Sequence, residues 1–255
     1  EGYSTMCGHA TIALGRFAVD QGIVPATVPE TVVNLQCPCG LVRVRVAVEE
    51  TPAGTVTGAV SFESVPSFAF ALDLVAEVPG VGKVPFDIGY GGAFYALVDT
   101  GAIGLDLRET PLDRLVEAAD RITKHVAATV PLEHPDDSDL AFLYGTILTD
   151  GGDGSGGKPS RNVCVFAERE VDRSPTGSGV SARIAVQSAR GLPTGEARLF
   201  ESLTSALFTA TPTRRDRVGR FAAVRVEVSG RAYYSGRSSF TVEEGDPLGG
   251  GFLLR

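Results

Sequence analysis

Much of this chain alternates between apolar and polar residues with a period of two, the pattern of a β-strand with one buried face. The clearest case is the segment 40–49, where the even positions from Val42 to Val48 are valine and Arg43 and Arg45 lie between them. The same pattern predicts strands over 31–36, 56–62, 68–78, 140–148, 162–169, 198–207 and 221–228, and a strand–Gly-Gly–strand unit over 84–99. The chain is therefore expected to consist mainly of β-sheet.

Three segments have helical spacing instead. The segment 111–129 is amphipathic, with apolar residues at every third or fourth position and charges between them. A shorter apolar helix is expected over 11–20, ending near Gly22, and another begins near residue 177. His125 on the amphipathic helix is expected to be a solvated or capping residue, and His134 to lie in a loop.

The two short helices begin in similar sequences, residues 6–13 (MCGHATIA) and 175–182 (PTGSGVSA). Aligning Cys7 with Thr176 places Gly8 on Gly177 and His9 on Ser178. A helix N-terminus carries free backbone N–H groups and a partial positive charge, so it can bind a carboxylate and lower the pKa of a thiol. Two such ends facing each other predict an anion site with a thiol on one side and a hydroxyl on the other.

Composition narrows the class of protein. The chain has 255 residues, 43% of them hydrophobic, which is enough for one large or two small domains. A net charge of −8 without a basic stripe argues against nucleic-acid binding, and no apolar run approaches the roughly 20 residues of a membrane span. Four cysteines without framework spacing indicate free thiols in a reducing compartment, so we expect a cytoplasmic protein.

Two motifs invite other interpretations. Cys37 and Cys39 could be half of a metal site, but no second pair or histidine cluster accompanies them, and a structural turn with buried thiols is favoured. The glycine-rich segment 150–157 lacks the Lys-Ser/Thr pair of a phosphate loop, and Lys158–Pro159 blocks a following helix, so we expect a hairpin loop. Cys164 lies in an apolar strand and is expected in the core. No metal site is predicted.

Several motifs resemble those of the proline racemase family. Residues 4–9 (STMCGH) and 172–179 (DRSPTGSG) are similar to its two signature motifs. Further similarity extends along the chain, at 34–40 (NLQCPCG), 90–95 (YGGAFY), 143–148 (LYGTIL) and 246–248 (DPL). Racemases and epimerases of this family carry a cysteine in both motifs. With Thr176 in place of the second cysteine, the second motif resembles that of one branch of the family, the trans-3-hydroxy-L-proline dehydratases.

The resemblance implies an α/β (α+β) fold like that of proline racemase and diaminopimelate epimerase. Two pseudo-symmetric lobes would each wrap a mostly antiparallel sheet around a central helix, with the active site in the cleft between them. Residues 1–80 and about 243–255 would form the first lobe, and 81–242 the second. Because the chain starts directly in the first motif, the N-terminal part of the first lobe is expected to be missing from this sequence.

The resemblance also implies a chemistry that needs no cofactor. Cys7 would remove the α-proton of trans-3-hydroxy-L-proline, and Thr176 would face it from the other side, where it cannot act as a second base near neutral pH. The 3-hydroxyl would then leave, making the protein a hydro-lyase whose product becomes Δ1-pyrroline-2-carboxylate. The other site residues follow from the motifs: Gly8, His9, Gly177 and Ser178 would hold the carboxylate and Asp172 the ring nitrogen.

Alternatives remain open at this point. Without the resemblance, Asp172 is read as an ordinary capping or turn residue. The protein could be a proline or 4-hydroxyproline racemase or epimerase, which Thr176 disfavours, or a non-catalytic protein that binds proline-like amino acids. In each case the partner is a small amino acid, and the oligomeric state stays open, a homodimer included.

Overall fold

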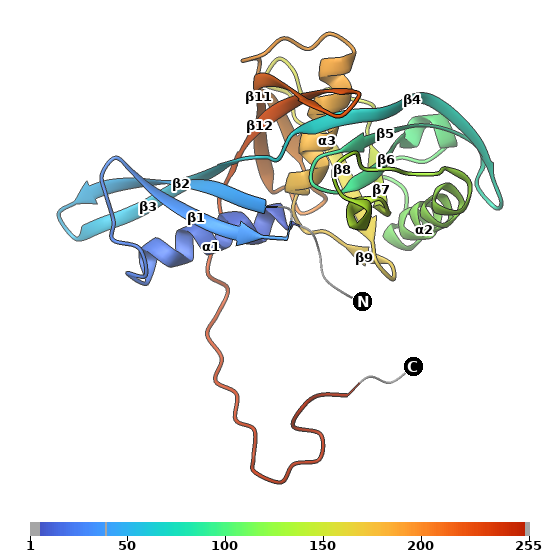
Figure 1. Cartoon of the computed structure of the whole chain (residues 1–255). Helices are drawn as coiled ribbons and strands as arrows, with labels where there is room; N and C mark the ends of the chain where they lie inside the picture. Colours follow the sequence, from blue (N-terminus) through green and yellow to red (C-terminus); the bar gives the residue numbers. More distant parts are fainter. Residues whose placement is uncertain (1–5, 39, 253–255) are drawn as a thin grey trace.

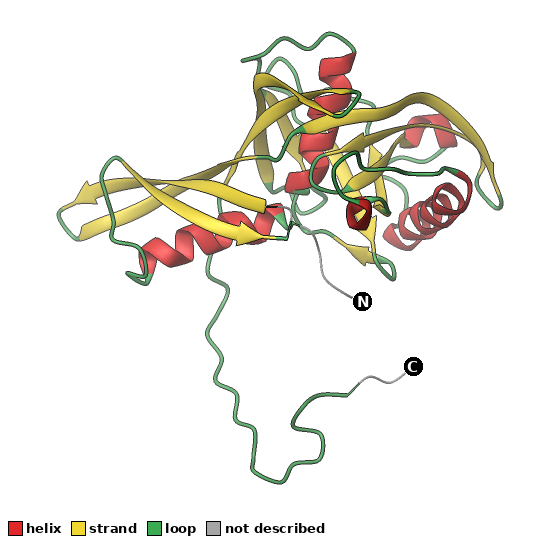
Figure 2. Ribbon diagram, in the orientation of Figure 1, coloured by secondary structure: helices red, strands yellow, loops and turns green. Residues whose placement is uncertain are grey.

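The computed structural model describes residues 6–38 and 40–252. These residues form three α-helices and a sheet of twelve strands (Figure 2). The helices are α1 (Gly8–Asp20), α2 (Leu112–Thr129) and α3 (Gly177–Ala189). Two short 3-10 helices, η1 (Thr100–Ile103) and η2 (Ser138–Leu140), flank α2 in the sequence. The strands are β1 (Glu30–Cys37), β2 (Gly40–Thr51), β3 (Gly54–Glu63), β4 (Ser67–Val78), β5 (Gly82–Tyr90), β6 (Phe94–Asp99), β7 (Leu143–Thr149), β8 (Ser160–Phe166), β9 (Glu170–Val171), β10 (Arg198–Glu201), β11 (Leu207–Val218) and β12 (Phe221–Gly230).

The strands run in the order β1-β2-β3-β12-β11-β10-β8-β7-β6-β5-β4, with β9 beside β8. A further pairing of β12 with β4 closes the part of the sheet from β4 to β12 on itself. Most pairs are antiparallel. Only β6–β7 and β8–β10 are parallel in the described sheet, and α2 and α3 make the crossovers that such pairs require. This mixed, mostly antiparallel architecture confirms the predicted fold class.

Each of the two short helices lies against strands, but their burial differs. α1 packs on β1, β2 and β3, and α3 lies inside the closed part of the sheet (Figure 1). Every residue of α3 from Gly177 to Val186 is buried, whereas α1 buries one face and exposes Leu14 and Phe17 on the other. We call α1 with β1–β3 the α1 half of the molecule, and β4–β12 with α2 and α3 the α3 half.

The valine-rich strands behave as their pattern predicts. The alternate valines of β2 are at most 1% exposed and form one core with the buried face of α1. Val224, Val226 and Val228 of β12 are buried in the same core, which continues onto Val180 and Ile184 of α3. One hydrophobic core therefore joins the two helices across the molecule.

The segment 198–207 differs from its prediction. It contains β10, a turn at residues 202–205, and the first residue of β11, a strand that extends to Val218. The second half of β11 does not show the alternating pattern of a strand, because Arg214, Arg215 and Asp216 do not alternate with buried residues. Its conformation comes from pairing with β12 along the strand. The strand predicted over 162–169 likewise ends at Phe166, because the chain turns there into β9.

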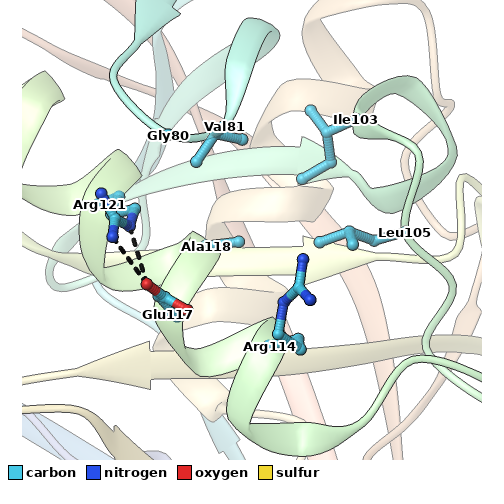
Figure 3. A pocket seen from close by; sticks show the side chains of 8 residues that line it. All are labelled: Gly80, Val81, Ile103, Leu105, Arg114, Glu117, Ala118 and Arg121. Carbon is cyan, nitrogen blue, oxygen red and sulfur yellow. Dashed lines mark hydrogen bonds and ion pairs between the residues drawn. The ribbon is translucent and has the colours of Figure 1, made fainter.

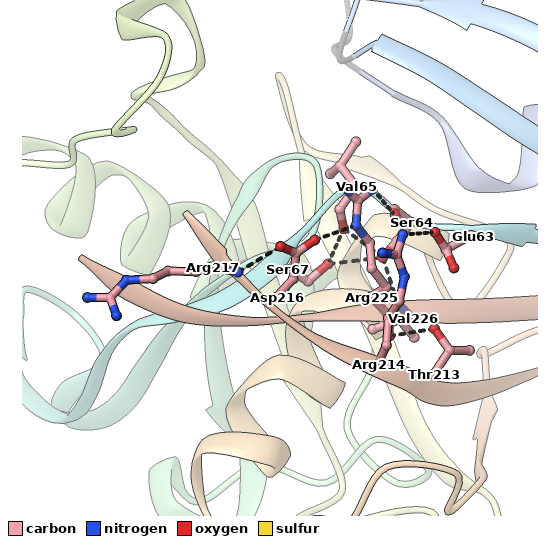
Figure 4. Close-up of polar contacts among 10 residues, drawn as sticks. All are labelled: Glu63, Ser64, Val65, Ser67, Thr213, Arg214, Asp216, Arg217, Arg225 and Val226. Atoms are coloured by element: carbon pink, nitrogen blue, oxygen red, sulfur yellow. Dashed lines mark hydrogen bonds and ion pairs between the residues drawn. The ribbon is translucent and has the colours of Figure 1, made fainter. Parts of the chain in front are cut away.

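A short link at residues 64–66 joins β3 of the α1 half to β4 of the α3 half, and it is fixed to β12 (Figure 4). The backbone N–H of Ser64 donates to the carbonyl of Val226 at 2.7 Å, and the Ser64 hydroxyl accepts from the N–H of Val226 at 3.0 Å. Arg225 donates to the Ser64 carbonyl at 3.3 Å and to Asp216 at 2.7 Å. These bonds hold the two halves in one fixed relation.

The limits of the two predicted lobes stay a prediction. Around residue 80, β4 and β5 form a hairpin, and the described residues 231–252 contain neither helix nor strand (Figure 1). Within the described chain, no helix is both long and apolar enough to cross a membrane.

Candidate active site

The N-termini of α1 and α3 meet, as the repeated sequence predicts. A Cβ atom added to Gly8 would lie 2.4 Å from the Cα of Gly177, and one added to Gly177 would lie 2.6 Å from the Cα of Gly8. No side chain fits at such distances. The two glycines therefore allow the free N–H groups of both helix ends to face the same small region.

Cys7 and Thr176 occupy equivalent places at this junction. Each is the N-cap residue of its helix, and neither side chain caps its own helix by a hydrogen bond. Both side chains are therefore available for other contacts. Thr176 has φ 70° and ψ 99°, in a region that β-branched residues rarely adopt.

Asp172 connects the two helix starts. One of its carboxylate oxygens lies 3.1 Å from His9 Nδ1 and accepts the N–H of Ser174 at 2.8 Å. The other accepts the hydroxyl of Thr176 at 2.9 Å. His9 Nδ1 also lies 3.2 Å from the Ser174 hydroxyl. The Asp172 side chain is only 7% exposed, so its charge depends on these partners.

The local electrostatics favour the ionised forms of Cys7, His9 and Asp172. Burial by itself would raise the pKa of the Cys7 thiol, but hydrogen bonds with His9 and with the backbone of Ala10 outweigh it and lower the pKa. The hydrogen bond to Asp172, followed by that to Cys7, raises the pKa of His9 to about 10. Burial opposes ionisation of Asp172 too, yet the bonds from His9 and Ser174 leave its pKa below the ordinary value. At neutral pH, an imidazolium therefore lies between a carboxylate and a thiol that ionises readily.

The start of α3 is supported from β6 and from the Gly-Gly segment. Ser178 is buried, and its hydroxyl lies 2.7 Å from the phenol oxygen of Tyr95, which is itself buried. A Cβ on Gly91 would lie 2.1 Å from the carbonyl oxygen of Ser178. The Gly-Gly segment is thus a close approach of backbone to the helix start rather than a plain turn.

Cys37, Cys164 and His134 lie outside this cluster, apart from one contact made by Cys164. Cys37 is partly exposed on β1, and Cys39 lies outside the described residues. No group of His, Cys, Asp or Glu in the described chain could hold a metal ion. Cys164 is fully buried in β8, where burial raises its pKa, and its side chain hydrogen-bonds with Thr176. His134 lies in a loop and packs on the ring of Tyr90, with centroids 4.7 Å apart.

A separate cavity of about 330 Å³ lies between the β4–β5 turn and α2 (Figure 3). Arg121 on its wall pairs with Glu117 at 2.7 Å, and the other lining residues include Val81, Ile103 and Leu105. None of the residues predicted for the active site lines this cavity.

All predicted site residues come together around the junction of the two helices. Ser174 and Tyr95 contact members of this group, and Asn162 contacts the carbonyl of Pro175 next to it; none of the three was predicted as a site residue. Ser174 lies inside the second motif, so its position was a usable signal. Tyr95 ends the motif at 90–95 but lies 83 residues from Ser178, and Asn162 lies on β8, 13 residues before Pro175. The packing of β6 and β8 brings both side chains to the start of α3.

Fold and site together define a two-part protein in which a thiol and a hydroxyl lie at opposed helix starts. Residues 1–253 match the proline racemase family, and the chain belongs to that family. It is 55% identical over 258 residues to a trans-L-3-hydroxyproline dehydratase from Xenopus tropicalis, covering 100% of this chain and 73% of that protein. It is 53% identical over 260 residues to the trans-3-hydroxy-L-proline dehydratase of Homo sapiens, again covering 100% and 73%.

Solved structures of the family have the same fold. A hydroxyproline epimerase from Agrobacterium vitis with bound trans-4-hydroxy-L-proline superposes with a TM-score of 0.88 at 30% identity, covering 98% of this chain and 70% of that one. A probable proline racemase from Agrobacterium radiobacter with bound carbonate gives a TM-score of 0.87 at 29% identity, covering 98% and 72%.

Proposed function

We propose that this protein is a hydro-lyase that dehydrates trans-3-hydroxy-L-proline to Δ1-pyrroline-2-carboxylate without a cofactor. The observation that carries the proposal is the pair of N-cap residues: a thiol, Cys7, opposite a hydroxyl, Thr176, at two helix starts that touch. The relatives named as dehydratases, at 51–55% identity in animals, support the same substrate.

The carboxylate of the substrate binds where the helix ends meet. The first N–H groups of α1 and α3, at Gly8, His9, Gly177 and Ser178, have no partner within their own helices. Neither helix has an acidic residue in its first turn, and the nearby Asp172 carboxylate is paired with His9 and Thr176. Asp172 binds the ring nitrogen of the substrate. Thr176 keeps the carboxylate of Asp172 in place by donating to it at 2.9 Å.

Catalysis begins with Cys7, whose thiolate takes the proton from Cα. The electron pair left on Cα is stabilised by the bound carboxylate and the helix ends around it. It then forms the Cα–C3 double bond as the C3–O bond breaks. In the trans isomer the α-hydrogen and the hydroxyl lie on one face of the ring, so the proton on Cys7 can return to the departing oxygen, and water leaves. The resulting enamine tautomerises to the cyclic imine.

A racemase or epimerase of proline or 4-hydroxyproline is the second candidate, since the solved hydroxyproline epimerase has the same fold. Two-base inversion requires an acid or base on the face opposite Cys7. Thr176 offers a hydroxyl that does not ionise near neutral pH and that already donates to Asp172. The dehydratase is therefore preferred.

The test is to incubate the purified protein with trans-3-hydroxy-L-proline and to detect the imine with o-aminobenzaldehyde. Cys7→Ser should fold but lose nearly all activity, and Cys37→Ser, which changes a partly exposed thiol on β1, is the matched control. If Cys7→Ser keeps turnover within about tenfold of the unmodified protein, about 1.4 kcal/mol of barrier, Cys7 is not the base. Protein that binds the substrate but neither forms imine nor exchanges deuterium at Cα of L-proline would be a binding protein.

A cytoplasmic location is part of the proposal. The described cysteines at positions 7, 37 and 164 are free thiols, which suits a reducing compartment. Fractionation of cells that produce the protein tests it. A homodimer stays a prediction, which light scattering on the purified protein can decide.

A further inference from the structure

The peptide bond between Pro175 and Thr176 is held at both ends. Its carbonyl oxygen accepts a hydrogen bond from Asn162 Nδ2 at 3.1 Å. Its N–H group, on Thr176, donates to the Ser174 hydroxyl at 3.0 Å. Asn162 is on β8 and fully buried, so the first of these bonds ties the motif to the rigid sheet.

This restraint acts where the backbone is strained. The φ of 70° at Thr176 is unfavourable for a β-branched residue, and rotation of the preceding peptide would relieve it. Strain of this kind persists only when the surroundings over-determine the conformation. The bonds from Asn162 and Ser174 supply that restraint, and the conformation they hold points the Thr176 hydroxyl at Asp172.

Arg183 in turn fixes the side chain of Asn162. Its guanidinium donates to Asn162 Oδ1 at 3.1 Å, to the Gly152 carbonyl at 3.0 Å and to the Ser160 hydroxyl at 2.6 Å. Arginine can only donate, so the amide oxygen of Asn162 must face it and the amide nitrogen must face Pro175. Burial lowers the pKa of Arg183 to about 10, which leaves it charged at neutral pH. The groups that accept directly from Arg183 are neutral, but Asp150 and Asp153 favour its charge and the guanidinium lies 4.6 Å from the centre of the Phe200 ring. The charge is therefore supported in the core, and the guanidinium fixes the orientation of the Asn162 amide.

We infer that Asn162, oriented by Arg183, is a positioning residue for substrate binding: it holds the strained Thr176 so that Thr176 fixes Asp172 for the ring nitrogen. The inference rests on the proposed function, because it assigns Asp172 to the substrate. Asn162 on β8, outside both signature motifs, is therefore required for tight substrate binding.

Asn162→Asp isolates this role. The aspartate keeps an oxygen toward Arg183 but presents an acceptor, instead of a donor, to the Pro175 carbonyl. Release of the strain then favours a relaxed loop by about 10- to 100-fold. Because apparent affinity falls with the competent fraction, KM for trans-3-hydroxy-L-proline should rise by about the same factor. The matched control is Asn34→Asp, on the exposed side of β1, which should change neither KM nor kcat.

Measuring KM and kcat separately distinguishes a positioning role of Asn162 from a loss of folded protein. Loss of folded protein lowers the apparent kcat and leaves KM unchanged. The inference is overturned if KM of Asn162→Asp stays within about threefold of the unmodified protein, or if kcat alone falls. Should Asn162→Asp fail to fold, Asn162→Ser brings no charge into the core and is judged by the same two criteria.

Repeating Asn162→Asp in the Thr176→Ser variant checks the strain argument independently. Thr176→Ser keeps the hydroxyl but removes the β-branch, so less strain remains to be released. The rise in KM caused by Asn162→Asp should be smaller in that background, and an equal rise in both would contradict the strain argument. If the unmodified protein forms no imine at all, the proposed function fails. If it forms imine and Asn162→Asp behaves like it, only the positioning role fails.

Discussion

Replacing Thr176 by cysteine should convert this site into one that inverts Cα. The two N-cap positions are equivalent across the helix junction, so a thiol at 176 would face Cα from the side opposite Cys7. The change removes the hydrogen bond from Thr176 to Asp172, a bond to a charged group worth about 1.5–3 kcal/mol. It also removes the β-branch at φ 70°, which returns part of this cost. The variant should therefore fold.

In the Thr176→Cys variant, the surroundings of the two thiols should make one of them a base and the other an acid. Cys7 hydrogen-bonds with His9, which lowers its pKa. A thiol at 176 would lie beside the Asp172 carboxylate, which favours its protonated form. One thiolate and one thiol on opposite faces are what proton removal and return require. General acid–base catalysis contributes about 10²–10⁴-fold, so inversion should rise clearly above the background.

The assay uses Thr176→Cys with L-proline and trans-4-hydroxy-L-proline, which have no leaving group at C3, and follows chirality by chiral chromatography. It must be run with a reductant, because Cys164 contacts residue 176 and could pair with the new thiol. Thr176→Ser is the control and should give no inversion. A folded Thr176→Cys protein that still dehydrates trans-3-hydroxy-L-proline yet never inverts would show that residue 176 does not occupy the second-base position.

Four further outcomes follow from the same geometry. Asp172→Asn should raise KM and slow turnover with Tm nearly unchanged; a large loss of Tm with unchanged kinetics would instead make Asp172 a structural residue. In a pH profile, kcat/KM should rise as Cys7 deprotonates, with a midpoint below the ordinary 9.0, and fall only near the pKa of about 10 at which His9 loses its proton. His9→Gln should move the rising limb to higher pH, and an unmoved limb would refute the pairing. Gly8→Ala should cost several kcal/mol by thermal melting, since its Cβ would lie 2.4 Å from Gly177; a change below about 1 kcal/mol would mean that the helix ends can separate freely.

Periodicity identified most of the secondary structure because the buried faces in question are regular. The valines of β2 and the apolar stripe of α2 alternate or repeat as burial demands, and both elements lie where the pattern places them. β11 was missed although its first half alternates in burial; its polar second half has no periodic burial and is held as a strand by β12. Local pattern therefore predicts elements that bury a face and fails for elements held mainly by backbone pairing.

The candidate site divides in the same way. The repeated motif determined by itself that Cys7 and Thr176 are equivalent N-cap residues, because a helix start and its glycine are local features. The contact of Gly8 with Gly177 depends on the closed sheet that encloses α3 and on the link at Ser64. Nothing local encodes those long-range pairings.

The sequence alone thus determined the equivalence of positions 7 and 176, and it predicted the reactive residue types and, through the family resemblance, the class of chemistry. Tertiary structure alone decided that His9 pairs with Asp172, and that Asn162 and Arg183 hold the strained peptide before Thr176. The physical reason is distance along the chain: His9 and Asp172 are 163 positions apart and meet only because two helices from different parts of the fold begin at one point. Charge pairing and buried hydrogen bonds act over a few ångströms, so their partners exist only once the fold has closed.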